Sequence, residues 1–300
     1  MEITATPVLT RDFRWNTTLT WSKNDNKILS LAEGADENQV ISTVGTASII
    51  GRVGGTTGDL WGYKLVRDPE GNVIIGDNGL PEQADEIEYV GTAYADWKAG
   101  WYNEFSYKGF KLGILLDGQV GGTIYSMSFH KMMEQGKLTQ SLNGRLPGTE
   151  YYMDANDPRI AAAGYTPQSG MYMIAPGVVR NDDGTFSPNT KVVTIESFYK
   201  EYYRRANVET NSFDASFLKI REIRLEYELP KKVLEKSPFS KASIAVYGRN
   251  LWCFTDYPLF DPESVALDGS SMVSGIETGS LLLQELSAST SILLSKEQKQ

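Results

Sequence analysis

The feature that most constrains the fold is a strict alternation of apolar and charged residues within the stretch Ser216 to Pro230. The two interleaved sets are Ile223, Leu225, Tyr227 and Leu229 on one side and Glu222, Arg224, Glu226 and Glu228 on the other. Because a β-strand repeats every two residues, this stretch predicts a strand with one apolar and one charged face. Such a strand fits a soluble sheet that covers a core, and it fits a membrane barrel with lipid on one face and a wet lumen on the other. Alternation alone leaves both alternatives open.

Longer motifs resemble one family. The run SFLKIREIRLEYELPKKVLEK, followed by ASIAVYGRNLWCFTDYPLFDPE, resembles the penultimate strands of the SusC/RagA family of TonB-dependent outer-membrane transporters. Three further stretches resemble the same family, in the same order along the chain: Asp12 to Gly34, Gly58 to Ile74 and Tyr89 to Ser126.

This resemblance implies an all-β fold, namely an antiparallel transmembrane β-barrel of about 22 strands with long extracellular loops. It implies that only the C-terminal portion is present, without the plug and the N-terminal barrel strands. The implied activity is import of oligosaccharides or peptides across the outer membrane. The implied partners are the lipid bilayer, a SusD-like surface lipoprotein and the TonB complex, the last through the missing N-terminal region. The resemblance implies no covalent chemistry, and therefore no catalytic residue and no enzyme.

Charge and cysteine usage exclude other classes. The chain carries 29 Lys and Arg against 38 Asp and Glu, a net charge of −9, which argues against a nucleic-acid partner. Cys253 is the only cysteine, so the chain forms no internal disulfide and no zinc cluster. The N-terminus has neither a basic region nor an apolar core and is therefore not a signal peptide. We expect the chain to be the C-terminal part of a longer transporter.

Residue patterns place several strands and turns. Arg11 to Lys23 predicts a strand with Trp15 and Trp21 on its apolar face, a turn at 24–26 and a returning strand at 27–31. The glycines between positions 45 and 62 lack a phosphate-loop ending, so they predict no nucleotide site. The resemblance instead makes 58–63 a barrel strand. Asp68 to Asn72 predicts a turn.

The middle of the chain carries the clearest hairpin. Residues 101–107 and 110–117 predict two strands joined by the two-residue turn Lys108-Gly109. A further strand is expected at 119–129. Periodicity is then lost from Met132 to Asp214, which we interpret as mostly extracellular loop, with a short helix at 197–205.

Candidate site residues are few. His130 is the only histidine, which excludes histidine triads, and we expect it to be a polar surface residue. Cys253 is expected to pack as a small hydrophobe. Turn formation explains Asp154, Asn156 and Asp157, and likewise Asp182 and Asp183, better than calcium binding does. We expect no metal and no cofactor. The best ligand-binding candidates are Tyr151, Tyr152, Tyr165 and Tyr172, either by stacking on sugars or peptides or by packing within the loop, and no binding residue is assigned.

The resemblance stops after Leu281. Relatives close their barrel with a strand ending in phenylalanine, whereas residues 282–300 differ entirely. Plausible codons for this tail, reread one nucleotide earlier, encode a Pro-Ser-Thr-Arg strand that ends in phenylalanine and a stop. We therefore expect barrel strands and loops over 1–281 and a frameshifted tail over 282–300. Such a chain is not expected to insert or transport by itself.

One alternative from another class remains open. A soluble, secreted β-sandwich that binds carbohydrate keeps both the alternation and the loop tyrosines. It would have to bury the aromatic faces of 11–23 and 110–117, and solubility without detergent would favour it.

Overall fold

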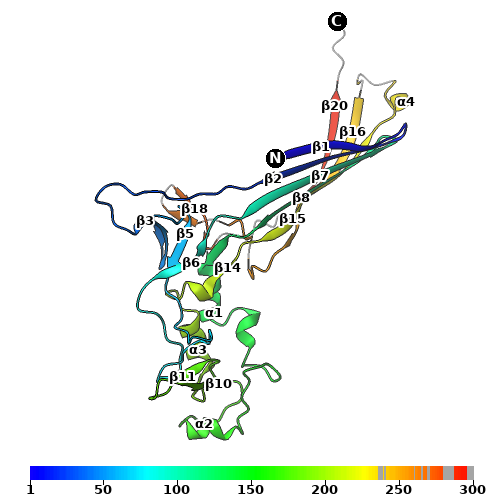
Figure 1. Ribbon diagram of the computed structural model, residues 1–300. Helices are drawn as coiled ribbons and strands as arrows, with labels where there is room; N and C mark the ends of the chain where they lie inside the picture. The colour runs from blue at the N-terminus through cyan, green and yellow to red at the C-terminus, as the bar shows by residue number, and fades with distance from the viewer. Residues whose placement is uncertain are drawn as a thin grey trace.

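The computed structural model describes residues 1–235, 239, 241–259, 261–264, 266–268, 271–279 and 287–295. Two parts are distinguished in Figure 1: a broad curved sheet, and a body of short strands and helices at one end of it. We call the first part the curved sheet. The second is the loop module, comprising 23–96, 121–216 and the described residues of 255–279. Within the described residues, no helix has the length and apolar character needed to cross a membrane.

The curved sheet contains seven strands in the order β1-β2-β7-β8-β15-β16-β20, and every neighbouring pair is antiparallel. Their bounds are β1 Glu2–Leu9, β2 Phe13–Ser22, β7 Trp97–Tyr107, β8 Phe110–Val120, β15 Phe217–Glu228, β16 Lys241–Phe254 and β20 Ser287–Ser295. The predicted predominance of antiparallel strands is confirmed. The described strands leave β1 and β20 as edges, so the sheet does not close on itself.

The strands predicted at 11–23, 101–117 and 216–257 correspond to β2, β7 with β8, and β15 with β16. The returning strand expected at 27–31 is wrong, because β2 pairs instead with β1, which the sequence analysis missed. The strand expected at 119–129 is also wrong. Gly121 and Gly122 both have positive φ and end β8, and the short strand β9, Thr123–Ser126, leads into helix α1, Met127–Glu134.

A β-bulge in β15 keeps the apolar residues on one face. The pairing with both neighbours shifts between Ile220 and Glu222. Arg221 is the extra residue in the pairing with β8, whereas in the pairing with β16 residues 250 and 251 correspond to Arg221 alone. Ile220 lies opposite Leu116 and Trp252, and beyond the bulge Ile223 lies opposite Ile114. Without the bulge, the alternation that starts at Glu222 would be out of phase with the beginning of the strand.

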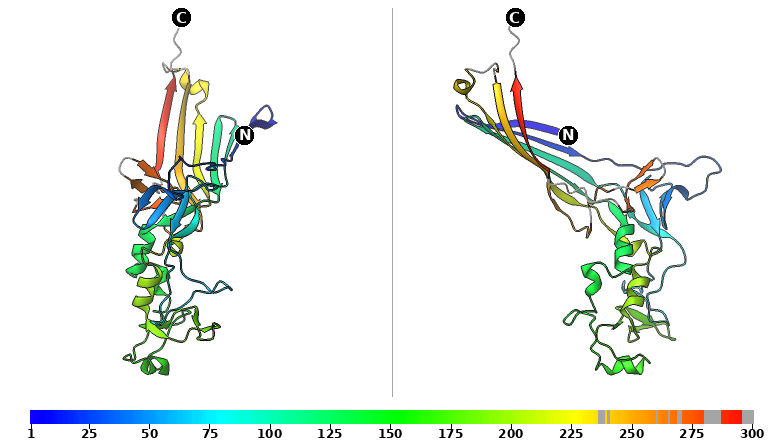
Figure 2. Two further views of the ribbon diagram at one scale, coloured as in Figure 1. Left: turned by 60° about the vertical axis from the view of Figure 1, so that its left-hand side comes forward. Right: turned by 180° about the vertical axis from the view of Figure 1, so that it is seen from behind.

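The connections of the curved sheet alternate in length. At one end β1, β7 and β15 pass into the next strand through 10–12, 108–109 and 229–240, the last of which contains α4, Lys231–Leu234. At the other end the connections are the three long segments of the loop module. Figure 2 shows the loop module at this second end only.

The turn at 108–109 has the geometry that a two-residue hairpin requires. Lys108 and Gly109 have φ of 44° and 88°, both in the left-handed region that glycine adopts without strain. A β-carbon at position 109 would also lie 3.2 Å from the backbone oxygen of Glu228. The predicted turn is confirmed.

We expect Gly109→Ala to lower the stability of the sheet by about 1–2 kcal/mol, the cost of placing an L-residue in the left-handed region. The measurement is the thermal unfolding midpoint in detergent. Lys108→Gly is the control, since it removes the same kind of strain and should leave the midpoint unchanged or higher. Equal loss in both variants would contradict this explanation.

The loop module consists of small sheets and short helices. Its sheets are β3-β4-β5-β6 (Gln39–Val44, Ala47–Gly51, Asp59–Gly62, Glu88–Thr92), β14-β9-β19 (Ser212–Asp214, Thr123–Ser126, Ile276–Glu277), β10-β13 (Tyr172–Ile174, Val192–Thr194), β11-β12 (Val178–Arg180, Phe186–Pro188) and β17-β18 (Ala266–Asp268, Ser271–Val273). Besides α1 its helices are η1 Thr139–Leu142, α2 Pro158–Ala162, α3 Ile195–Tyr202 and η2 Glu209–Asn211. The expectation that 58–63 is a barrel strand is wrong, because β5 belongs to a separate sheet.

Two hydrophobic cores hold the loop module together. One core gathers residues of all three long connections: Ala47, Ile49, Leu60, Tyr125, Val208, Ala266, Val273 and Ile276. The other lies between α1, α3 and the β10-β13 ladder and includes Phe129, Met133, Met173, Ile195 and Phe198. The helix expected at 197–205 is confirmed as α3. The segment 132–214, expected to be mostly loop, therefore contains short elements packed around a core that it shares with Ile75 and Phe129.

Candidate functional site: the polar face and the loop-module pocket

One face of the curved sheet carries its charged side chains, and we call it the polar face. Cross-strand ion pairs run along it. Lys111 lies 3.7 Å from Glu226 and 3.9 Å from Glu228, and Arg249 donates to Glu222 across the β15-β16 pair at 2.8 Å. Opposite charges on facing positions of neighbouring strands stabilise the pairing. The charged side of the alternation is thus a continuous hydrophilic surface.

A cluster of five charged groups lies where the polar face meets the loop module. Lys219 donates to Asp261 at 2.5 Å and also to Glu263. Arg221 donates to Asp117 at 2.8 and 2.6 Å and to Glu263 at 2.6 Å. We call these five residues the ion cluster. It joins β8, β15 and the segment that follows β16.

Local structure explains how this cluster forms. Lys219 and Arg221 are two positions apart on β15 and therefore share a face, so both side chains reach the same carboxylate, that of Glu263. The ring of Phe217 lies 4.5 Å from the ammonium nitrogen of Lys219, which favours the cation further. On the acidic side, the backbone N–H of Glu263 donates to Asp261 in a tight turn. All five charged groups are paired, so the cluster acts as a clamp that holds 255–264 across the polar face.

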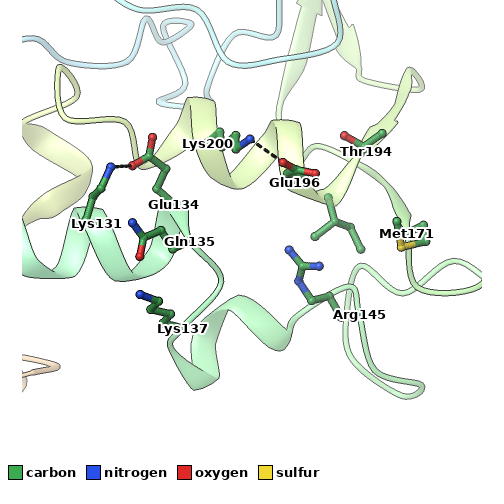
Figure 3. A pocket seen from close by; sticks show the side chains of 10 residues that line it. Lys131, Glu134, Gln135, Lys137, Arg145, Met171, Thr194, Glu196 and Lys200 are labelled. Carbon is green, nitrogen blue, oxygen red and sulfur yellow. Dashed lines mark hydrogen bonds and ion pairs between the residues drawn. The ribbon is translucent and has the colours of Figure 1, made fainter.

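The loop module has a pocket of about 730 Å³. Figure 3 shows its lining, contributed by α1 and the turn after it, the loop after η1, the turn before β10 and the start of α3. The lining residues are Lys131, Glu134, Gln135, Lys137, Arg145, Met171, Thr194, Ile195, Glu196 and Lys200. We call this cavity the loop-module pocket.

Two ion pairs lie within the pocket lining. Lys131 donates to Glu134 at 2.7 Å, and Lys200 donates to Glu196 at 2.5 Å. These lysines hold the pKa of Glu134 and of Glu196 below the usual value, so both carboxyl groups are ionised at neutral pH. The two pairs therefore contribute no net charge.

The candidate tyrosines are packed into the module and do not form a stacking platform. Tyr172 is buried in a small core, and the ring of Tyr165 lies 4.8 Å from it, between centroids. Tyr151 packs at the edge of the core between α1 and α3, where burial raises the pKa of its hydroxyl. Tyr152 is half-buried. Of the two interpretations of these tyrosines, packing within the loop fits Tyr151, Tyr165 and Tyr172.

The acidic loop residues make the expected turns. Asp154 accepts from the backbone N–H of Asn156 at 2.9 Å, and Asp183 accepts from that of Thr185 at 2.9 Å. The guanidinium of Arg159 donates hydrogen bonds to the carboxylate of Asp157, the shortest of them 2.6 Å long from Nη2 to Oδ2. These bonds lower the pKa of that carboxyl to about 2. No group of metal-ligating side chains suited to hold an ion occurs in the described part of the chain. Turn formation accounts for these residues. Asp182 has no contact that needs another explanation.

The expectation that His130 is a surface residue is wrong. His130 is in α1 and only 4% exposed, and its Nδ1 donates to the backbone oxygen of Tyr203 at 2.7 Å. Burial lowers the pKa of this imidazole. Cys253, expected to pack as a small hydrophobe, is half-buried and lies opposite Lys219 on the polar face.

We expect the loop module to lose stability as the pH falls through about 6.5 to 5. The unfolded chain takes up a proton at the ordinary histidine pKa, whereas folded His130, with its lowered pKa, resists it. The loss in the free energy of unfolding approaches about 1.4 kcal/mol per pH unit below the ordinary histidine pKa. Thermal unfolding followed from pH 7.5 to 5 measures it. Since His130 is the only histidine, His130→Gln should flatten this window, and an unchanged slope in that variant would contradict the assignment.

No local pattern in the sequence marks the residues of the ion cluster or of the pocket as functional. Lys219 and Arg221 look like ordinary charged residues of an alternating strand, and their acidic partner Glu263 follows about forty positions later. The signal that the sequence offers is the acidic turn Asp261 to Glu263, a few residues after the end of β16.

No family model matches the chain. Two curated relatives come from Formosa agariphila. TonB-dependent receptor P3 is 24% identical over 86% of this chain and 24% of its own length, and TonB-dependent receptor P26 is 23% identical over 87% and 25%. The chain therefore spans about a quarter of the length of these relatives. The predicted resemblance to TonB-dependent receptors is confirmed.

Solved structures show the same fold. The structure of the RagAB peptide transporter matches with a TM-score of 0.55 and 15% identity, over 97% of this chain and 28% of the other. The RagAB peptide importer in its closed-closed state matches with a TM-score of 0.53 and 14% identity, over 97% and 28%. Almost the whole chain, curved sheet and loop module together, thus has a counterpart in these structures.

Proposed function

We propose that this chain, a relative of TonB-dependent receptors, forms part of the wall of an outer-membrane importer together with a share of its external loops. The observation that carries the proposal is the two-faced curved sheet. Its polar face bears the ion pairs described above, and its other face is apolar and exposed. A protein with this arrangement is suited to stand between lipid and a water-filled passage.

The apolar face is large and uncovered. The exposed apolar side chains on it include Leu19, Trp21, Trp97, Trp101, Phe110, Leu218, Ile223, Leu225, Ile244, Val246, Trp252 and Phe254. A soluble β-sandwich would cover such a face with a second sheet. In the described part of the chain no second sheet lies on it, which counts against the alternative of a secreted carbohydrate-binding module.

Aromatic side chains mark both ends of this face. Near the short connections Phe13, Tyr107, Phe110 and Tyr227 occupy neighbouring positions on four strands. Near the loop module the aromatic residues are Trp21, Trp97, Trp101, Trp252 and Phe254. Between them β8 and β15 carry aliphatic side chains, whereas β2 and β7 place Thr17 and Asn103 there. An apolar band between two aromatic girdles is the pattern of an outer-membrane barrel wall.

Polar atoms on the apolar face are satisfied within the protein. Asn103 accepts from the indole N–H of Trp15 at 3.0 Å, and Thr17 accepts from that of Trp101 at 2.9 Å. Because lipid supplies no hydrogen-bond partners, buried polar groups facing it must be paired internally. These two indole bonds meet that requirement.

Connection length supports one orientation. Short turns of outer-membrane barrels face the periplasm and long loops face the exterior. The loop module therefore lies outside the cell. The short connections at 10–12, 108–109 and 229–240 face the periplasm. In the whole protein, a preceding plug would receive energy from the TonB complex, and a SusD-like lipoprotein would cover the external side. The residues 1–281 then provide barrel strands and loops.

The cargo we propose is a peptide or an oligosaccharide. The RagAB structures are those of a peptide transporter and a peptide importer, which favours the peptide alternative. The proposed frameshift over 282–300 concerns a tail whose described residues, 287–295, pair with β16 as β20. Resequencing the DNA for residues 275–300 tests that part of the proposal.

Brominated detergent tests the lipid-facing role directly. Of the six tryptophans, Trp15, Trp21, Trp97, Trp101 and Trp252 lie on the apolar face. In dodecyl maltoside with brominated chains, tryptophan fluorescence should fall by more than half relative to ordinary dodecyl maltoside. This test needs no closed barrel, because a micelle coats an open sheet as well. A monomer that is soluble without detergent, with fluorescence that bromine leaves unchanged, would refute the proposal.

A further inference from the structure

We propose that the loop-module pocket binds a carboxylate group of an anionic ligand. This inference rests on the proposed function, in which the loop module faces the exterior and meets ligands as they arrive. The site is distinct from the ion cluster, where every charged group already has a partner.

The pocket is cationic on an acidic protein. Lys131, Lys137, Arg145 and Lys200 contribute four positive charges to its lining, and Glu134 and Glu196 contribute two negative ones. The net charge of the lining is 4 − 2 = +2, whereas that of the whole chain is −9. A concave site whose charge opposes that of its surroundings concentrates ligands of the opposite sign. This pocket is therefore suited to an anion.

Two cations account for the excess. The pairs Lys131–Glu134 and Lys200–Glu196 neutralise each other, which leaves Lys137 and Arg145. Within the described residues, neither has a carboxylate at ion-pairing distance. Figure 3 shows both side chains on the side of the pocket across from α3. They are the groups available to a ligand.

The side chain of Arg145 is held in place by a hydrogen bond from its Nε atom. Its Nε donates to the backbone oxygen of Ser141 at 3.1 Å, which fixes the guanidinium plane. The terminal nitrogens then present parallel donors, the geometry that matches the two oxygens of a carboxylate. A point charge such as Lys137 strengthens binding without imposing a direction.

The pocket walls are tied together before any ligand arrives. The Tyr199 hydroxyl lies 3.1 Å from the backbone oxygens of both Gln140 and Asn143, so α3 holds the loop that carries Arg145. On the next wall, the backbone N–H of Ile195 donates to Met171 at 3.0 Å. Pre-arranged walls reduce the entropy that a ligand must offset.

The shared chemistry of the ligand is a carboxylate, and two sources supply it: an acidic peptide or an acidic oligosaccharide. A cavity of about 730 Å³ is of the size that holds small ligands. We would titrate the full chain, purified in nonionic detergent at low salt, with triglutamate and with trigalacturonate. Triglutamine and the methyl ester of trigalacturonate are the neutral counterparts. Calorimetry gives the dissociation constants.

The expected result is that at least one acidic probe binds and that its neutral counterpart binds at least about tenfold more weakly. Arg145→Gln and Lys137→Gln should each weaken the acidic probe, with the larger loss for Arg145. Arg180→Gln is the matched control, because Arg180 is an exposed arginine of the loop module outside the pocket. It should change the dissociation constant by less than about twofold. Preference for one acidic probe identifies the source.

Three results would overturn the inference: no binding of either acidic probe, equal binding of acidic and neutral probes, or an equal loss in the Arg145 and Arg180 variants. The quenching experiment separates this failure from that of the proposed function. A chain that bromine quenches but that binds no acidic probe loses only the pocket assignment. A chain that binds the probe and is soluble without detergent loses only the outer-membrane role.

Discussion

Replacing Lys219 with methionine should release the segment 255–264 from the polar face and lower the stability of the protein by about 3 kcal/mol. The Lys219 side chain is 3% exposed, and its ammonium group pairs with both Asp261 and Glu263. Its removal takes away the cation that pairs with Asp261, and it leaves Glu263 to share Arg221 with Asp117. Those carboxylates are about a third exposed, so water offsets part of the loss, and the expected value lies at the low end for a broken buried pair.

Lys111→Met is the matched control for this prediction. Lys111 lies on the same polar face, but it is 40% exposed and its pairs span 3.7 and 3.9 Å. An ion pair of this kind contributes less than about 1 kcal/mol. Urea unfolding in detergent measures both variants, and limited proteolysis shows whether 255–264 becomes accessible. Similar losses for the two lysines, or an intact segment in Lys219→Met, would mean that the ion cluster is not a clamp.

Glu277→Ala is the second variant with a large expected effect, a loss of about 3 kcal/mol. Glu277 is fully buried at the start of α1, where its carboxylate accepts from the hydroxyls of Ser126 at 2.7 Å and Ser128 at 2.8 Å. It also accepts from the backbone N–H of Gly279. A negative charge at a helix N-terminus is stabilised further by the helix dipole. Alanine would remove the acceptor of the buried Ser126 hydroxyl and of the half-buried Ser128 hydroxyl.

Glu277→Gln should lose less than Glu277→Ala, because the amide retains one acceptor oxygen and the shape of the side chain. Glu196→Ala is the exposed comparison: Glu196 also lies in the first turn of a helix, α3, and its side chain is 66% exposed. Thermal unfolding followed by circular dichroism should show no shift for it. An unfolding midpoint of Glu277→Ala equal to that of the wild type would contradict this explanation. It would mean that the buried carboxylate does not hold the third long connection against α1.

The elements most faithfully predicted from sequence depend on local patterns. The hairpin β7-β8 follows from period-two alternation and from a turn whose two residues need positive φ. The turn at Asp68 follows from a side chain that accepts the backbone N–H groups of Glu70 and Asn72. Both signals involve residues only a few positions apart, so no distant contact is needed to read them.

Predictions failed where a distant contact decides the outcome. The segment 27–31 reads as a returning strand, yet β2 pairs with β1, whose own sequence gives a weaker signal. His130 reads as a surface residue, but α1 packs against α3, and the carbonyl of Tyr203 takes up its N–H. For the tyrosines at 165 and 172 the sequence left ligand stacking and loop packing open, and the structure packs them in a core with Met153, Ile160 and Val192.

The sequence by itself determined the strands β2, β7, β8, β15 and β16 of the curved sheet, their two faces and the resemblance to TonB-dependent receptors, because alternation and motifs are properties of neighbouring residues. Only the tertiary structure decided the rest. It joined three long connections into one loop module and paired Lys219 with carboxylates from another segment. It also placed Lys137 and Arg145 in a pocket where, among the described residues, neither has a carboxylate at ion-pairing distance. These outcomes depend on which side chains meet after the chain folds. Contacts between residues that are distant in the sequence determine which side chains are buried and which charges are paired, and residue type alone does not.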